Sequence, residues 1–265
     1  MKTSTAARMK EIPAELAAAG RFGKFGPETE ITTRKSPDVK TSFALEAMLN
    51  AWHDVGEIDA VWIDNHYGRM RAVVGKFAYS PEDVQIFSLA LGAHQGGKLF
   101  PLKAGLFLSA LANGSKVDGA TINISHYEEP VSYLGYRNKK KIIVKGDTGL
   151  MTGSNMFGGE MVIEGNAGWR LGFEMRGGSI IVKGDVDNDV GDRMENGSIS
   201  VKGNARDFVG AHMKGGEVII EGNARGLGYH MRGGSISING DFEFISTDQM
   251  LGGKIFQKGK LIFEK

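Results

Sequence analysis

Hydrophobic residues alternate with other residues in short segments of the C-terminal half, and glycines bound each segment. The recurring motif is G-G-x-[IV]-x-[IV]-x-G, with Met or Val at some aliphatic positions. A period of two predicts a β-strand with these residues on one face. The glycines before and after each strand permit sharp corners with positive φ. The aliphatic pairs are Met161/Ile163, Ile180/Val182, Ile199/Val201, Val218/Ile220 and Ile236/Ile238.

Methionines mark a longer period over the same region. Six of them, separated by 19, 19, 19, 18 and 19 residues, are Met156, Met175, Met194, Met213, Met231 and Met250. A fixed period near 20 indicates one structural unit stacked on itself. No segment between turns is long enough for a helix, so we predict a right-handed parallel β-helix with about 19 residues per rung. We expect the methionines to form an internal column, because thioethers fill irregular gaps.

Stacked rungs bring equivalent outward positions into columns. Most of these columns carry charges of alternating sign, which predicts solvent-exposed ladders of weak ion pairs. One column is different, because Val162, Ile181 and Ile219 are apolar and only Ser200 and Ser237 are polar. We predict that Val162, Ile181 and Ile219 form an interface with another protein. A plain exposed β face, or a face covered by the N-terminal region, are the alternatives.

The chain divides into three parts. Residues 1–35 are predicted to be loosely ordered, with a short helix at 13–19. Residues 36–118 are predicted to form a mixed α/β domain that caps the β-helix, since a bare solenoid end exposes its core and strand edges. The β-helix covers 119–265, with degenerate rungs over 119–145 and regular repeats over 146–265.

Local patterns predict the elements of the capping region. Residues 41–54 read as an amphipathic helix with Phe43, Ala47, Leu49 and Trp52 at helical spacing. Residues 58–63 and 70–74 read as strands of a hairpin turned at 65–68. Ser80-Pro81 predicts a helix start, and residues 102–111 predict a further helix.

The repeat resembles a known domain over residues 141–265, about half of the chain. Segments such as GNAGWRLGFEMRGGSIIVKGD are similar to the glycine-repeat (GXGXG) β-helix domain. That domain forms the C-terminal part of the glutamate synthase large subunit and the C subunit of formylmethanofuran dehydrogenase. In both families it is a scaffold, and the flavin, iron–sulfur, molybdenum or tungsten chemistry lies elsewhere.

The resemblance implies a non-catalytic assembly subunit of a multi-subunit oxidoreductase complex. It implies no cofactor on this chain and partners that are other subunits of an oxidoreductase or amidotransferase complex. A homo-oligomer is also open, and enzymatic activity stays undecided.

The composition restricts the kinds of partner and the cellular compartment that we expect for this chain. The formal net charge is +1, which offers no electrostatic case for nucleic acid or an anionic membrane. There are no cysteines, so thiolate ligation of an iron–sulfur cluster, a Cys nucleophile and a disulfide are all excluded. Apolar stretches such as 104–112 are too short to cross a bilayer, and residues 1–20 hold no apolar signal core. We expect a cytoplasmic protein.

One motif suggests a binding loop in the N-terminal half. Residues 92–98 (GAHQGGK) fit G-x-x-x-x-G-K, but Leu99 stands where a phosphate-binding loop has its Mg²⁺-ligating hydroxyl. Pro101 is expected to disturb the helix that should begin there. Gly92, Gly97 and Lys98 are therefore a candidate anion loop, or an ordinary glycine-rich turn.

This loop supports a second hypothesis for the whole chain. The chain would be a self-sufficient enzyme, or a binder of a small ligand or anion. Its site would lie between the N-terminal domain and the β-helix, with His66 and His94 as further candidates.

Two metal-like patterns in the repeats are incomplete. Residues 185–189 (DVDND) begin like a Ca²⁺ loop, but Val190 and Asn196 occupy its glycine and glutamate positions. His212 and His230 are equivalent in adjacent rungs, but their column offers no matching carboxylate or third histidine beside them, since Glu174 lies two rungs away. We therefore assign no catalytic, cofactor-binding or metal-binding residue.

Overall fold

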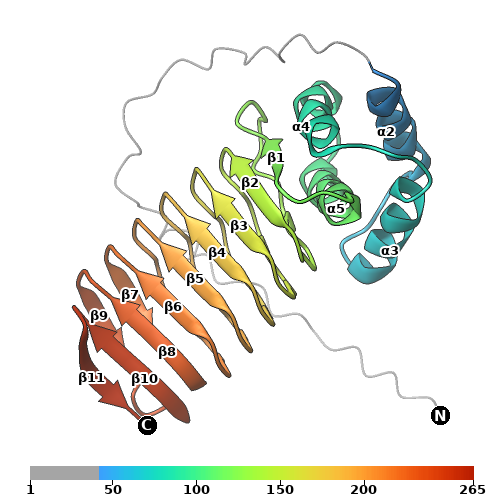
Figure 1. Cartoon of the computed structure of the whole chain (residues 1–265). Coiled ribbons are helices and arrows are strands. Elements are labelled where there is room, and N and C mark those ends of the chain that lie inside the picture. Colours follow the sequence, from blue (N-terminus) through green and yellow to red (C-terminus); the bar gives the residue numbers. More distant parts are fainter. Residues whose placement is uncertain (1–41) are drawn as a thin grey trace, which may run out of the picture. The chain divides into compact units, whose positions relative to one another are not determined.

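The computed structural model describes residues 42–265 (Figure 1). The predictions for residues 1–35, including the short helix at 13–19, lie outside this range. Every described helix falls before residue 119 and every strand after it. The helices are α2 (Phe43–Asp54), α3 (Ile63–Val74), α4 (Pro81–Ala90), the 3₁₀ helix η1 (Leu91–His94) and α5 (Phe100–Gly114).

Most strands stack in one nine-stranded sheet, as the tiers of Figure 1 show. Each strand pairs in parallel with the next from β1 to β10, and only the last pair, β10 and β11, is antiparallel. The parallel β-helix with about 19 residues per turn is therefore confirmed. In order, the strands are β1 (Ala120–Asn123), β2 (Lys141–Lys145), β3 (Glu160–Ile163), β4 (Ser179–Val182), β5 (Ser198–Val201), β6 (Glu217–Ile220), β8 (Arg232–Ile238), β10 (Gly252–Gln257) and β11 (Lys260–Glu264).

The register follows the period-two pattern of the sequence. Ile199 pairs with Ile180 on one side and with Val218 on the other, and all three are fully buried. All six repeat methionines are fully buried as well, so the internal methionine column is confirmed. The predicted first rungs are also confirmed, because β1 and β2 begin the sheet in parallel pairing.

A glycine with positive φ stands at the corner before each of the strands β3 to β6. Gly178 has a φ of +87°, a conformation that residues with a side chain rarely adopt. A Cβ placed there would also lie only 2.6 Å from the carbonyl carbon of Gly158 in the preceding turn. The predicted positive-φ corners are thus confirmed, and close contact between turns is a second reason for the glycines.

The 18-residue spacing has a local cause. In the longer turns, Arg170, Asp189 and Phe208 occupy a left-handed corner, with φ near 60°. In the following turn this corner is replaced by a short strand, β7 (Ala224–Leu227), which pairs with β9 (Phe242–Ile245) in a second parallel sheet. An extended segment covers the same path with one residue fewer.

The side chains at the [ND] position of the repeat join the turns. The amide of Asp185 donates to Asn166 Oδ1 (2.9 Å), and the amide of Asn204 donates to Asp185 Oδ1 (2.7 Å). Asp147 and Asn223 continue the same ladder at either end. Asp185 is therefore a structural residue of the β-helix, which accounts for the start of the DVDND segment.

Within the described residues 42–118 the capping region holds helices and no strand, so the prediction of a mixed α/β domain is wrong there. A hairpin was expected over 58–74, but residues 63–74 form the helix α3 instead. His66, Tyr67, Met70 and Val74 lie on its buried face, at helical rather than alternating spacing. The aromatic and β-branched residues of this segment favour a strand when taken by themselves. The packing of α3 against α5 stabilises a helix instead.

Helix α2 has the predicted extent but a different buried face. Ser42 caps it by accepting a hydrogen bond from the amide of Leu45 (3.1 Å). Its buried residues are Leu45, Met48, Ala51 and Trp52, whereas Phe43 is 87% exposed. Of the four residues expected on the inner face, only Trp52 and the half-buried Leu49 contact the core, because the apolar pattern was ambiguous between adjacent faces.

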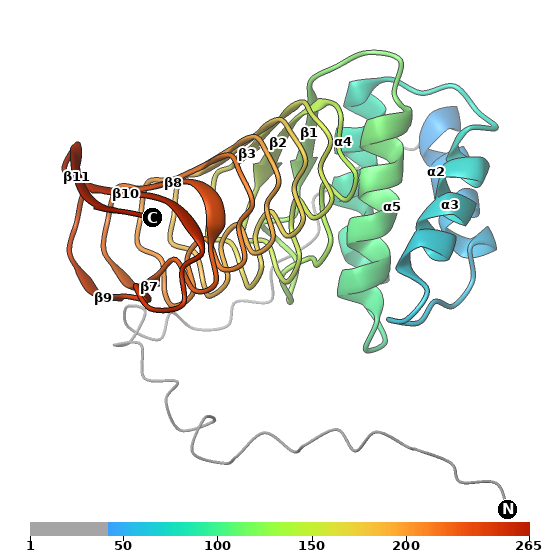
Figure 2. The ribbon, with the colours of Figure 1, turned by 90° about the horizontal axis from the view of Figure 1, so that it is seen from below.

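The helices and the stack share one hydrophobic core. Helix α4 packs against β1, and Figure 2 shows α4 and α5 beside this end of the sheet. Ser80 and Asp83 form a capping box at the start of α4, which confirms the predicted helix start. Helix α5 confirms the helix predicted over 102–111. No helix among residues 42–265 combines the length and apolar character needed to span a bilayer.

Candidate functional site

The glycine-rich loop leads from η1 directly into α5. Gly97 adopts a φ of +79°, and its carbonyl accepts a hydrogen bond from the amide of Phe100 (3.1 Å). The helix then begins at Phe100 with Pro101 in its first turn. The expectation that Pro101 disturbs this helix is wrong, because first-turn amides have no partner within the helix and proline has no amide to leave unpaired.

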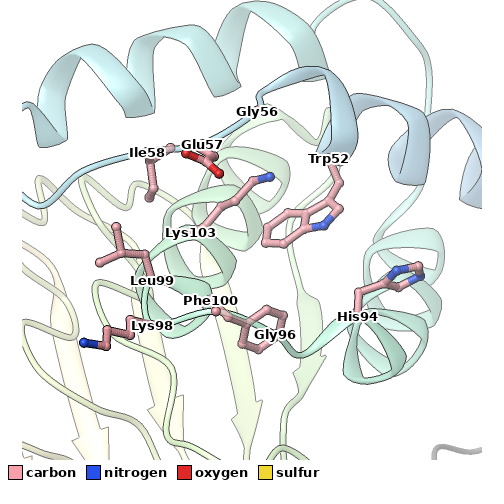
Figure 3. Close-up of a pocket in the computed structure, with 11 residues that line it drawn as sticks. Trp52, Gly56, Glu57, Ile58, His94, Gly96, Lys98, Leu99, Phe100 and Lys103 are labelled. Atoms are coloured by element: carbon pink, nitrogen blue, oxygen red, sulfur yellow. The ribbon is translucent and has the colours of Figure 1, made fainter.

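A pocket of about 480 Å³ lies beside this loop (Figure 3). It is bounded by the end of α2, the segment that follows α2, the loop itself and the first turn of α5. The residues that line it are Trp52, Gly56, Glu57, Ile58, His94, Gly96, Gly97, Lys98, Leu99, Phe100 and Lys103.

Lys103 is the pocket residue that points most clearly to one class of ligand. Its Nζ lies 4.1 Å from the centroid of the Trp52 ring, within cation–π range. Burial, and secondarily the charge of Arg69, lowers the pKa of Lys103. An anion here would relieve the cost of burying this ammonium group.

His94 lines another part of the pocket wall. Its ring lies 5.6 Å from that of His53 at the end of α2. Burial, followed by repulsion from His53, lowers the pKa of His94. The neutral imidazole is therefore favoured, with a nitrogen able to accept a hydrogen bond.

The structure divides the candidate anion loop. Gly97 and Lys98 line the pocket, but Gly92 is buried in η1, where a Cβ would lie 2.3 Å from His126 Nε2. Gln95 Nε2 donates to the Gly92 carbonyl (2.8 Å), which closes this part of the loop on itself. The segment does not wrap one site over its full length, and Gly92 serves packing.

The pocket also lies elsewhere than expected. Its lining residues all belong to the helical cap, whereas the sequence placed an alternative site between the cap and the β-helix. His66 is not among them. It is buried in α3, where its Nε2 accepts a hydrogen bond from the amide of Asp59 (3.2 Å).

The predicted aliphatic interface residues lie in one column, which Ser200 interrupts. Val162 pairs with Ile181, Ile181 with Ser200, and Ile219 follows on the next strand. Each is partly exposed and lies between buried neighbours, so it belongs to the outer face of the sheet. The register adds Ile143, which pairs with Val162, and Phe256, which pairs with Ser237; sequence reasoning left both out although they keep the period of the repeat.

His212 and His230 do come together. Their rings stack with centroids 5.3 Å apart and planes inclined by 21°. Within residues 42–265, however, no group of three His, Asp or Glu side chains could hold a metal ion.

Neither a protein-family model nor a curated protein matches this chain.

Proposed function

We propose that this chain is a non-catalytic assembly subunit that docks a partner protein on the outer face of its β-helix. The observation that carries the proposal is the aliphatic column. Ile143, Val162 and Ile181 are adjacent on three paired strands, and Ile219 follows across Ser200. Burial of such a strip against another protein is favourable by roughly 25 cal/mol per Å² of apolar area.

The stacked sheet supports this role mechanically. Backbone hydrogen bonds join every neighbouring pair of turns, and the [ND] ladder adds side-chain bonds between them. The outer face is thus held as one surface, so a partner can bind with little loss of conformational entropy.

The resemblance to the glycine-repeat domain supplies the class of partner. We propose subunits of a cytoplasmic oxidoreductase or amidotransferase complex, of glutamate synthase or formylmethanofuran dehydrogenase type. Flavin, iron–sulfur, molybdenum or tungsten cofactors would then lie on those subunits.

The test is a double substitution in the column, Val162→Lys with Ile181→Lys, in the native host. The variant should fold but lose its co-purifying oxidoreductase or amidotransferase subunits, identified by mass spectrometry. Thr247→Lys with Gln249→Lys is the matched control, since it adds the same charge at exposed polar positions outside the column. Retention of the same subunits by the Val162/Ile181 variant would contradict the proposal, as would co-purification of none by the wild type.

The cap pocket supports a second candidate function, the binding of a small anion. Lys98 and Lys103 line a pocket into which the first turn of the 15-residue helix α5 also projects. Helix N-termini and cations both favour negative charge.

Calorimetric titration with inorganic phosphate tests this second function. Saturable binding should weaken in Lys103→Gln and stay unchanged in Lys116→Gln, which removes an exposed lysine outside the pocket. Equal weakening in both variants would indicate a general charge effect and no site.

A further inference from the structure

A second pocket arises from one small residue in the repeat. Hydrogen bonds between turns stack Phe173, Asp192, Ala211 and Tyr229 in a single column. Ala211 is the smallest of these, so its turn lacks the side chain that fills the same space in the turns on either side. A pocket of about 310 Å³ opens there.

One wall of this pocket holds two largely buried carboxyl groups. The side chains of Asp189 and Asp192 are only 20% and 7% exposed. They share one guanidinium, since Arg170 Nε lies 3.5 Å from Asp189 Oδ2 and 3.9 Å from Asp192 Oδ2. Asp192 Oδ1 is buried without a hydrogen-bond partner in the described part of the chain.

The titration behaviour of the two carboxyls agrees with this geometry. Burial raises the pKa of both, and repulsion from Asp189 raises that of Asp192 further. Asp187 acts in the same direction on Asp189. Arg170, Arg193 and His212 lower the pKa values but do not cancel the effect of burial. An additional cation would therefore be stabilised here.

The other wall is aromatic. The Phe208 and Tyr229 rings have centroids 5.5 Å apart at 70°, and the His212 and Tyr229 rings are 5.7 Å apart at 87°. Such steep angles build a concave corner instead of a flat stack. Phe208 is also 39% exposed.

The two arginines of the pocket are held toward the acidic end. The guanidinium carbons of Arg170 and Arg193 lie 5.5 Å and 5.6 Å from the centroid of the Phe173 ring. Arg193 also pairs with Glu174 at 3.8 Å. These contacts leave the aromatic corner without a cation of its own.

We propose that this pocket binds an organic ammonium ion. A single ligand of this class uses both walls, because its charge is neutralised by the carboxylates while its N-alkyl groups contact the ring faces. An anion would meet the buried, unpartnered Oδ1 of Asp192, and a neutral apolar ligand would leave that oxygen uncompensated. The site is independent of the outer aliphatic column and of the cap pocket.

Titration calorimetry with tetramethylammonium chloride tests the proposal on the full chain. The matched ligand is tert-butanol, which is similar in shape but uncharged, and sodium chloride serves as the ionic-strength blank. We expect saturable binding of tetramethylammonium and none of tert-butanol. Shifts of the Phe208 and Tyr229 ring resonances in NMR spectra should accompany it.

Two substitutions test the two walls separately. Asp192→Asn removes a charge with little change of shape, and Tyr229→Leu removes a ring face. Each should weaken tetramethylammonium binding by roughly tenfold or more. Asp248→Asn, which removes an exposed carboxylate outside the pocket, should leave the affinity unchanged. Should Asp192→Asn fail to fold by circular dichroism, Tyr229→Leu decides.

Three results would overturn the proposal. Tetramethylammonium could fail to bind, tert-butanol could bind equally well, or every folded pocket variant could keep the wild-type affinity. Magnesium chloride could also bind in place of tetramethylammonium, with this binding lost in Asp192→Asn. That result would overturn the proposal too, because the ligand would then be a metal ion.

Discussion

At the scale of single residues, the fold depends on which side of a strand each side chain takes. In β5 the neighbours Ile199 and Ser200 take opposite faces, one fully buried and one partly exposed. The burial is repeated on adjacent strands, so an inward residue contacts equivalents on both sides. A truncation there leaves a cavity that the regular backbone cannot collapse to fill.

Ile199→Ala should therefore lower the free energy of unfolding by roughly 2–4 kcal/mol. Ser200→Ala is the matched control and should change it by less than about 0.5 kcal/mol, as surface substitutions do. Urea unfolding followed by circular dichroism measures both. Similar small effects of the two substitutions would mean that the inner and outer faces are reversed.

A pH dependence is expected from Asp192. Burial raises its folded pKa above the unfolded value, so folding makes this carboxyl easier to protonate. Compared with a residue that does not titrate, Asp192 makes its full contribution to stability at pH values below its unfolded pKa. This contribution is lost as the pH rises through its folded pKa.

Asp192→Asn should consequently raise the melting temperature near pH 7, and the gain should shrink as the pH approaches about 4. Thermal unfolding of both proteins across this range provides the measurement. A gain that grows on acidification would show that the carboxylate is stabilised by its arginine more than it is penalised by burial.

At the scale of elements, we expect glycine to affect stability in opposite directions in the helices α5 and α3. Gly105 in α5 faces the first turn of the β-helix, where an added Cβ would lie 1.8 Å from the Ser132 carbonyl oxygen. Gly68 in α3 has open space at the same point. The close approach of α5 to the stack depends on Gly105, although glycine is a poor helix former.

Gly105→Ala should destabilise the protein in spite of alanine's better helix propensity, because the backbone of the first turn must move. Gly68→Ala should stabilise it by roughly 0.5–1 kcal/mol, the usual gain within a helix. Chemical denaturation of the two variants compares them directly. Stabilisation by both would indicate that α5 does not press against residue 132.

At the scale of the molecule, we expect the helical cap and the β-helix to unfold as one cooperative unit. Their buried side chains form a single cluster that runs from α2 to the last turns of the stack. Phe87 of α4 is fully buried in it, and α4 packs against β1. The cap thereby shields the end of the sheet, which would otherwise expose its core.

Phe87→Ala should cost roughly 3–5 kcal/mol. The helical circular dichroism signal and the hydrogen-exchange protection of the β1 and β2 amides should be lost in one transition. Loss of the helical signal at a lower temperature, with these amides still protected, would show that the cap unfolds by itself.

The sequence by itself determined the β-helix. Its inward positions, its methionine column and its glycine corners all follow from contacts between equivalent residues in adjacent turns. A repeat encodes these contacts locally, because residue i meets residue i + 19 wherever the period is kept. Sequence reasoning missed the strand β7, which lies in the 18-residue turn where the period lapses, and it left out the outward residue Ile143, although Ile143 keeps the period.

Only the tertiary structure decided the cap and both pockets. The segment now in α3 carries residues that favour strands, and its helix is selected by α5, which follows some forty residues later in the chain. Lys103 meets Trp52, and Asp192 meets Arg170, through packing that no local pattern encodes. Propensity and periodicity predict contacts between residues that are close in sequence or equivalent in a repeat. A binding pocket forms where such residues leave space unfilled, so these patterns do not predict it.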